Sequence, residues 1–179
     1  MIELMLKQKY ITLKISFCFF LFLNLCYCQT RNYLTKGQFE NIKVDGISLK
    51  QIVESNGEIK KMSSLFGNTL KYKKVYEPNE SIGFWDKGFY FDFEDRSGNG
   101  TFELVNFSID DSISIISINN NDITIGSSIR NMKGVTVSNY DDGTKGIIYA
   151  IRGHESEAIF ISFNTHTKRI LKIEFISFD

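Results

Sequence analysis

Cysteine is scarce in this 179-residue chain, and its three cysteines, Cys18, Cys26 and Cys28, all lie within the first 28 residues. Residues 29–179 contain none. If the first 28 residues are removed, the remaining domain has no disulfide, no thiolate nucleophile and no cysteine-based metal site. We therefore expect its stability to come from a buried apolar core, and we expect no cofactor.

Proline is equally rare, and neither charge dominates. Pro78 is the only proline, and no Pro-rich or Gly/Ser-rich stretch marks a flexible linker. Residues 29–179 are therefore predicted to form a single domain. The first 28 residues carry three of the 21 basic and one of the 21 acidic side chains, which leaves 18 basic and 20 acidic side chains in the domain. This balance argues against a nucleic-acid partner, which would select a basic surplus.

The long apolar run of the chain is its leader. Three lysines precede an almost unbroken apolar stretch of 14 residues, Ile15 to Cys28, and the polar Gln29 follows. This order predicts a signal peptide over residues 1–28, cleaved between Cys28 and Gln29, and places the domain in the periplasm or outside the cell. As a helix the stretch would span roughly 21 Å, short of the ~30 Å hydrocarbon core, so no transmembrane span is expected after cleavage. A lipid anchor on Cys26 or Cys28 is the alternative, although bulky residues precede both cysteines.

The domain is predicted to be α+β, an antiparallel β meander with one main helix packed on the sheet. The helix is expected over residues 55–67, because Ser55 and Glu58 fit a capping box and Gly67 fits a C-terminal cap. Between them, apolar residues recur at helical spacing: Ile59, Met62, Leu65 and Phe66.

The remaining residues read mostly as strands. Asp45-Gly46 predicts a hairpin turn between a strand over residues 39–44 and another over 47–49. Phe89, Phe91 and Phe93 are expected on one face of a strand, and a change of phase after Leu104 suggests a bulge or burial on both faces. A short helical turn at 127–132 gives the second half the same order as the first. Residues 39–110 and 122–179 are therefore possible tandem half-repeats.

One segment resembles a known family. Leu65-Phe66-Gly67, a strand, and then Trp85-Asp86-Lys87-Gly88-Phe89-Tyr90-Phe91 resemble an uncharacterised family of small exported bacterial proteins. The helix-then-meander order is also similar to beta-lactamase inhibitor protein and to small outer-membrane assembly lipoproteins. The resemblance implies a helix packed on a sheet, and it supplies no catalytic residue.

Three patterns could carry chemistry. His154 and His166 are the only histidines, lack ligand spacing, and are expected in solvated turns. The loop that begins at Asp95 spaces its oxygen side chains like a calcium loop, although Asn106 stands where a bidentate carboxylate is needed. The carboxylates of Asp92, Glu94 and Asp95 would suit glycoside hydrolysis only if they converge. Solvated strand carboxylates and an ordinary loop are the simpler interpretations, and no catalytic or metal-binding residue is predicted.

The aromatic cluster is the best candidate for an interaction surface. Phe84, Trp85, Asp86 and Tyr90 are predicted to contact a partner, because tryptophan and tyrosine dominate interface hot spots. The alternative is that Trp85 fills the gap between helix and sheet. We therefore expect an exported, non-enzymatic binding protein of the bacterial envelope, whose partner is another protein or an envelope component. An immunity or enzyme-inhibitor protein and a carboxylate-dependent envelope hydrolase are the alternatives.

Overall fold

The computed structural model describes residues 30–76, 80–139 and 144–177, and the part from Arg31 onward forms one compact unit. The predicted signal peptide, its Cys28–Gln29 cleavage site and Pro78 lie outside the described residues. In chain order the elements are β1 (Asn32–Leu34), α2 (Lys36–Glu40), β2 (Lys43–Val44), β3 (Ile47–Ser48), α3 (Leu49–Glu54), α4 (Ile59–Phe66), β4 (Lys71–Val75), β5 (Ser81–Asp86), β6 (Phe89–Glu94), β7 (Glu103–Ile109), β8 (Ile116–Ile118), β9 (Asn121–Ile123), the 3-10 turn η1 (Ile129–Asn131), β10 (Ser138–Asn139), β11 (Lys145–Ile151), β12 (His154–Phe163) and β13 (Ile170–Ser177).

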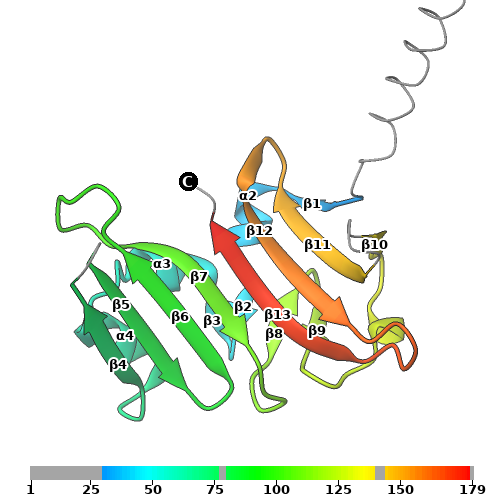
Figure 1. The fold of residues 1–179 in the computed structure, drawn as a ribbon, viewed down its shortest axis with the longest axis horizontal. Helices are drawn as coiled ribbons and strands as arrows, with labels where there is room; N and C mark the ends of the chain where they lie inside the picture. The colour runs from blue at the N-terminus through cyan, green and yellow to red at the C-terminus, as the bar shows by residue number, and fades with distance from the viewer. Residues whose placement is uncertain (1–29, 77–79, 140–143, 178–179) are drawn as a thin grey trace, which may run out of the picture. The chain divides into compact units, whose positions relative to one another are not determined.

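Two antiparallel meanders make up most of the large sheet. The first is β4–β5–β6–β7 and the second is β11–β12–β13, and the described sheet has the order β1-β11-β12-β13-β7-β6-β5-β4 (Figure 1). The meanders join where β13 pairs with β7, with Phe175 opposite Phe107. Helices α3 and α4 lie behind the first meander in Figure 1, so one face of that meander is covered. The architecture is α+β with an antiparallel meander, as predicted.

A chain of aromatic rings runs through the core beneath both meanders. Phe89, Phe91 and Phe93 share one buried face of β6, which confirms the alternation predicted for this strand. From α4, the Phe66 ring lies 4.8 Å from that of Phe89 and 5.3 Å from that of Phe91. The contacts continue from Phe91 to Phe107, from Phe107 to Phe175 and from Phe175 to Phe39, at ring-centroid distances of 5.8, 5.4 and 5.8 Å. Tilted and offset rings at these distances add to the gain from apolar burial. One aromatic core therefore spans the seam between the meanders.

The main helix is shorter than the interval predicted for it. Helix α4 begins at Ile59, and its N-cap residue, Glu58, makes no side-chain cap hydrogen bond. Ser55 instead ends the preceding helix, α3, where its hydroxyl donates to the Ile52 carbonyl at 2.6 Å. The capping box predicted from Ser55 is therefore wrong, because the serine already belongs to another helix. Gly67 ends α4 with a φ of 91°, the positive value that favours glycine at this position.

The N-terminal region contains two helices that the apolar pattern did not predict. Each begins with a complete capping box, at Thr35 and Gln38 for α2 and at Ser48 and Gln51 for α3. The strand expected over residues 39–44 is therefore confined to Lys43–Val44. The turn at Asp45-Gly46 is as predicted, with positive φ at both residues.

The phase change in β7 is a bulge. Asp92 pairs with Asn106 and Phe93 pairs with Leu104, so Val105 is the extra residue of β7. Leu104 and Val105 are both buried, so this segment contains a bulge and is also buried on both faces. The bulge lies in β7, the strand that pairs with β13 at the seam.

Candidate functional site

The four residues of the predicted interaction surface separate in the fold. Phe84 is 0% exposed and stands edge-on to Phe93 in the core, so it does not belong to a surface. Trp85 pairs across the hairpin with Tyr90, and both are half-buried. The Tyr90 ring lies over Gly83, where a Cβ would come within 2.8 Å of the Tyr90 hydroxyl. Phe66 fills the space between α4 and β6. The alternative interpretation of the sequence assigned this packing role to Trp85.

Trp85 and Asp86 line a shallow hollow of about 820 Å³, here called the Trp85 surface. Its other lining residues are Asp45, Ile47, Leu65, Phe66, Thr69, Lys71, Lys87, Phe89 and Ile113. Ile113 is 62% exposed. The Asp86 carboxylate accepts hydrogen bonds from the Thr69 hydroxyl at 2.6 Å and from the Lys87 amide at 2.8 Å. The bond from Thr69, followed by that from the Lys87 backbone, lowers the pKa of Asp86, so a carboxylate is present at neutral pH.

Hydrogen bonds to Asp45 hold the loop that carries Ile113. The Asp45 carboxylate accepts from the Ser114 hydroxyl at 2.9 Å and from the Ile115 amide at 2.7 Å. The Asp45 amide in turn donates to the Ile115 carbonyl at 2.8 Å. Gly88 packs against the same loop, because a Cβ on it would lie 2.9 Å from the Ser114 hydroxyl oxygen. The exposed isoleucine therefore stands on a fixed support.

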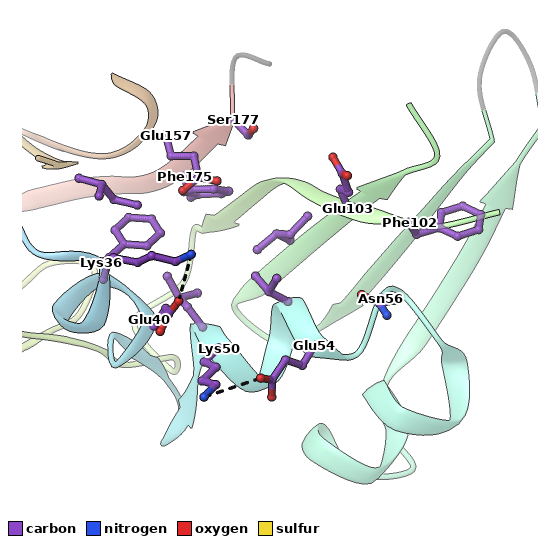
Figure 2. Close-up of a pocket in the computed structure, with 15 residues that line it drawn as sticks. Lys36, Glu40, Lys50, Glu54, Asn56, Phe102, Glu103, Glu157, Phe175 and Ser177 are labelled. Carbon is purple, nitrogen blue, oxygen red and sulfur yellow. Dashed lines mark ion pairs between the residues drawn. The ribbon is translucent and has the colours of Figure 1, made fainter. Parts of the chain in front are cut away.

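A second concavity of about 470 Å³ lies between the helices α2 and α3 and the strands β7 and β13, and we call it the α2/α3 cleft (Figure 2). Its apolar lining is Phe39, Leu49, Val53, Phe102, Leu104, Ile151 and Phe175. Its charged lining is Lys36, Glu40, Lys50, Glu54, Glu103 and Glu157. These residues come from several segments far apart in the chain, so no local sequence motif predicts the cleft. The capping boxes of α2 and α3 are the sequence signal that would have placed its helical wall.

The carboxylates considered for hydrolysis do not converge. Asp92 and Glu94 alternate with the buried phenylalanines of β6 and occupy its other face, whereas Asp95 is largely buried at the start of the following loop. Burial, and then the negative charge of Glu94, raises the pKa of Asp92, and the Tyr90 hydroxyl acts in the opposite direction. Asp92 and Glu94 share a sheet face with each other and not with Asp95.

The loop after β6 is organised around Asp95. Its carboxylate accepts the Asn99 amide at 3.2 Å, the Gly100 amide at 2.7 Å and the Ser97 hydroxyl at 3.4 Å. The oxygen side chains of this loop are therefore spaced so that they accept hydrogen bonds from the loop itself. Across the described ranges, no group of three or more His, Cys, Asp or Glu residues is placed to hold a metal ion.

The two histidines lie far apart. His154 begins β12 and His166 follows the end of that strand, and both are exposed. A ten-residue strand extends roughly 30 Å, so the two imidazoles cannot bind one metal ion.

None of the described helices is long and apolar enough to cross a membrane. No protein-family model matches the chain, and no curated protein matches it. Among solved structures, a cysteine-rich secretory protein from Staphylococcus aureus is similar at 15% identity and a TM-score of 0.34. The similarity covers 66% of this chain and 43% of that protein. A TM-score of this size does not establish a common fold.

Proposed function

We propose that this protein is an exported, non-enzymatic binding protein of the bacterial envelope, and that its partner docks on the Trp85 surface. The observation that carries the proposal is the group of apolar side chains left partly exposed around Trp85: Ile47, Leu65, Phe66 and Ile113. Apolar side chains gathered on a protein surface and surrounded by polar groups are typical of a protein-docking site.

The chemistry of the Trp85 surface suits a protein partner. Tryptophan is among the residue types most enriched in interface hot spots, and apolar side chains lie beside Trp85. Asp86, Lys71 and Lys87 add charges of both signs at the edge, where they give orientation more than affinity. Because the loop bearing Ile113 is held by Asp45, docking would cost little ordering of the backbone.

Because the predicted leader directs export, we expect the partner to lie outside the cytoplasm. A protein with a photo-reactive benzoylphenylalanine in place of Ile113 is expected to cross-link to one partner in envelope extracts. The matched control carries the same probe at Leu171, which is 57% exposed and does not line the Trp85 surface. Excess unlabelled protein should abolish the cross-link, whereas the Ile113→Lys variant should not compete.

Equal cross-linking at both positions, or none at Ile113, would contradict docking on the Trp85 surface. The mass of the captured species distinguishes a toxin or enzyme, which would indicate an immunity or inhibitor protein, from a structural envelope component. Turnover of an envelope glycan by the purified protein, lost in Asp92→Asn, would contradict the non-enzymatic assignment.

A further inference from the structure

We propose that the edge strand β4 binds an extended acidic segment of a partner protein, which adds one strand to the large sheet. β4 ends the described sheet, and its pairing partner among the described strands is β5 alone. In an antiparallel edge strand, alternate residues direct their N–H and C=O groups away from the sheet. These groups can pair with the main chain of another polypeptide, the binding mode called β-augmentation.

β4 is the longest of the described strands that are paired on one side only. It has five residues, all exposed, and it stands at the outer margin of the first meander in Figure 1. The other strands of this kind are shorter: β1 and β9 have three residues each, and β3 and β10 have two. Short edge strands resist unwanted pairing. The β4 edge is therefore the part of the described sheets best suited to accept an added strand.

The side chains of β4 give this edge a positive charge. Three of its five residues are lysines, Lys71, Lys73 and Lys74, and none of them forms an ion pair with another described residue. The β5 residues opposite them, within Ser81–Trp85, carry no charge. An acidic segment would supply the counter-charges that the sheet does not.

The carboxylates close to β4 come from the neighbouring segments. Glu80 precedes β5 and Asp86 ends it, so both belong to the side of β4 that is already paired. Glu58, at the start of α4, lines a shallow hollow with Lys74 but is paired with Lys61 at 2.6 Å. The open edge of β4 therefore presents lysines and no carboxylate of its own, which favours an acidic partner.

The same lysines disfavour a second copy of this chain as the occupant. If two β4 strands paired in antiparallel fashion about Lys73, that lysine would face its own copy and Lys74 would face Tyr72. Like charges directly opposite each other destabilise a strand pair, and lysines on edge strands are a common protection against self-association. An acidic segment meets no such repulsion.

The two faces of β4 predict the pattern of the added segment. Lys73 lies opposite Gly83, on the sheet face away from the phenylalanine core. Tyr72 lies on the core side, where its ring is 6.3 Å from that of Phe84, and it is 50% exposed. Because side chains alternate along a strand, every second side chain of the segment would lie beside Lys71 and Lys73, and the others beside Tyr72. We therefore expect carboxylates that alternate with apolar residues, which would shield Tyr72 from water.

The test uses three end-capped synthetic peptides, titrated into the 15N-labelled protein and followed by NMR. The acidic peptide Thr-Glu-Val-Glu-Val-Glu-Thr is expected to shift the amides of Lys71–Val75 saturably, with a Kd on the order of 1 mM. The basic peptide Thr-Lys-Val-Lys-Val-Lys-Thr should bind about tenfold more weakly at low salt, and added salt should narrow the difference. The peptide Thr-Glu-Pro-Glu-Pro-Glu-Thr keeps the acidic charge but cannot pair along a strand, so it should also bind about tenfold more weakly.

A charge-reversal variant and a matched control locate the binding. Lys73→Glu should weaken binding of the acidic peptide about tenfold and tighten binding of the basic peptide. Lys145→Glu changes an exposed lysine on β11, a strand paired on both sides, and should change neither affinity. Unchanged amide shifts outside β4 check that both variants keep the fold.

Equal affinity for the acidic and basic peptides overturns the charge argument, and equal affinity for the acidic valine and proline peptides overturns strand addition. The absence of saturable shifts in β4 overturns the site altogether. Shifts of β4 amides that appear on raising the protein concentration alone assign the edge to a second copy and also overturn the proposal.

This inference does not rest on the proposed docking function. The β4 edge shares only Lys71 with the lining of the Trp85 surface, and Ile113 lies outside β4. Cross-linking through Ile113 needs no strand addition at β4, so failure of the edge proposal and failure of the docking proposal are distinguishable.

Discussion

Replacing Phe107 by alanine tests whether the two meanders share one core. Phe107 on β7 is fully buried, stacks on Phe175 of β13 at 5.4 Å and contacts Phe91 at 5.8 Å. It therefore lies on the seam where the first meander meets the second. Truncating a buried phenylalanine costs about 3–5 kcal/mol, a large part of the ~5–15 kcal/mol that stabilises an ordinary domain.

Urea unfolding followed by tryptophan fluorescence and circular dichroism measures this loss. With an m value of about 2 kcal/mol per molar, Phe107→Ala should lower the midpoint by about 1.5–2.5 M, and Phe107→Leu should lower it by less than half as much. Leu171→Ala is the matched control, because Leu171 is exposed and its truncation should cost about 0.5 kcal/mol or less.

A double-mutant cycle makes the test specific to the seam. Phe107 and Phe175 should couple by about 0.5–1.5 kcal/mol, the range for aromatic pairs in contact. Both probes should report one transition, because a shared core unfolds cooperatively. Two separated transitions in the wild-type protein, or a loss for Phe107→Ala no larger than that for Leu171→Ala, would refute the shared core.

Three further substitutions test local features. Gly88→Ala should lower the free energy of unfolding by about 1–3 kcal/mol, because φ is +87° and the new Cβ would meet the Ser114 hydroxyl and backbone nitrogen. Gly100→Ala is the control: φ is +82° but no atom lies near the new Cβ, so it measures the cost of the backbone conformation without the steric contact. Asp92→Asn should raise the melting temperature at pH 7 and have little effect at pH 3. Burial, and then a neighbouring carboxylate, raises the folded-state pKa of Asp92. Its ionisation therefore lowers stability as pH rises above the ordinary carboxyl range. A melting-temperature gain equal at both pH values would contradict this. Tyr149→Phe should raise the free energy of unfolding by about 1 kcal/mol, because its buried hydroxyl lacks a hydrogen-bond partner among the described residues. Burial raises the pKa of Tyr149 to about 12, so the hydroxyl is neutral at pH 7 and this gain should not depend on pH near neutrality. A lower denaturation midpoint would indicate that the hydroxyl is paired.

Local patterns predicted the elements whose signal lies within a few residues. The alternation of Phe89, Phe91 and Phe93 gave β6 and its buried face, and Asp45-Gly46 gave the first hairpin. The change of phase after Leu104 gave the bulge. In each case the signal is a property of the backbone and of adjacent side chains, which other parts of the chain do not change.

Competing local signals led to the errors. Ser55 fits an N-cap when Glu58 is considered alone, but the capping box at Ser48 starts an earlier helix that ends at Ser55. Helices α2 and α3 have five and six residues, too short to display an apolar period, although their caps are clear in the sequence. In helices this short, the capping boxes are a better guide than the apolar period.

The sequence by itself determined the α+β class and the buried face of β6, because both depend on composition or on neighbours along the chain; the leader stays a prediction from the sequence. Only the tertiary structure decided that Phe84 is core while Trp85 lines a hollow, that β7 and β13 join the meanders, and that helices α2 and α3 form a cleft with those strands. Contacts between residues distant in sequence depend on the simultaneous packing of several elements, and no short window of sequence contains that information.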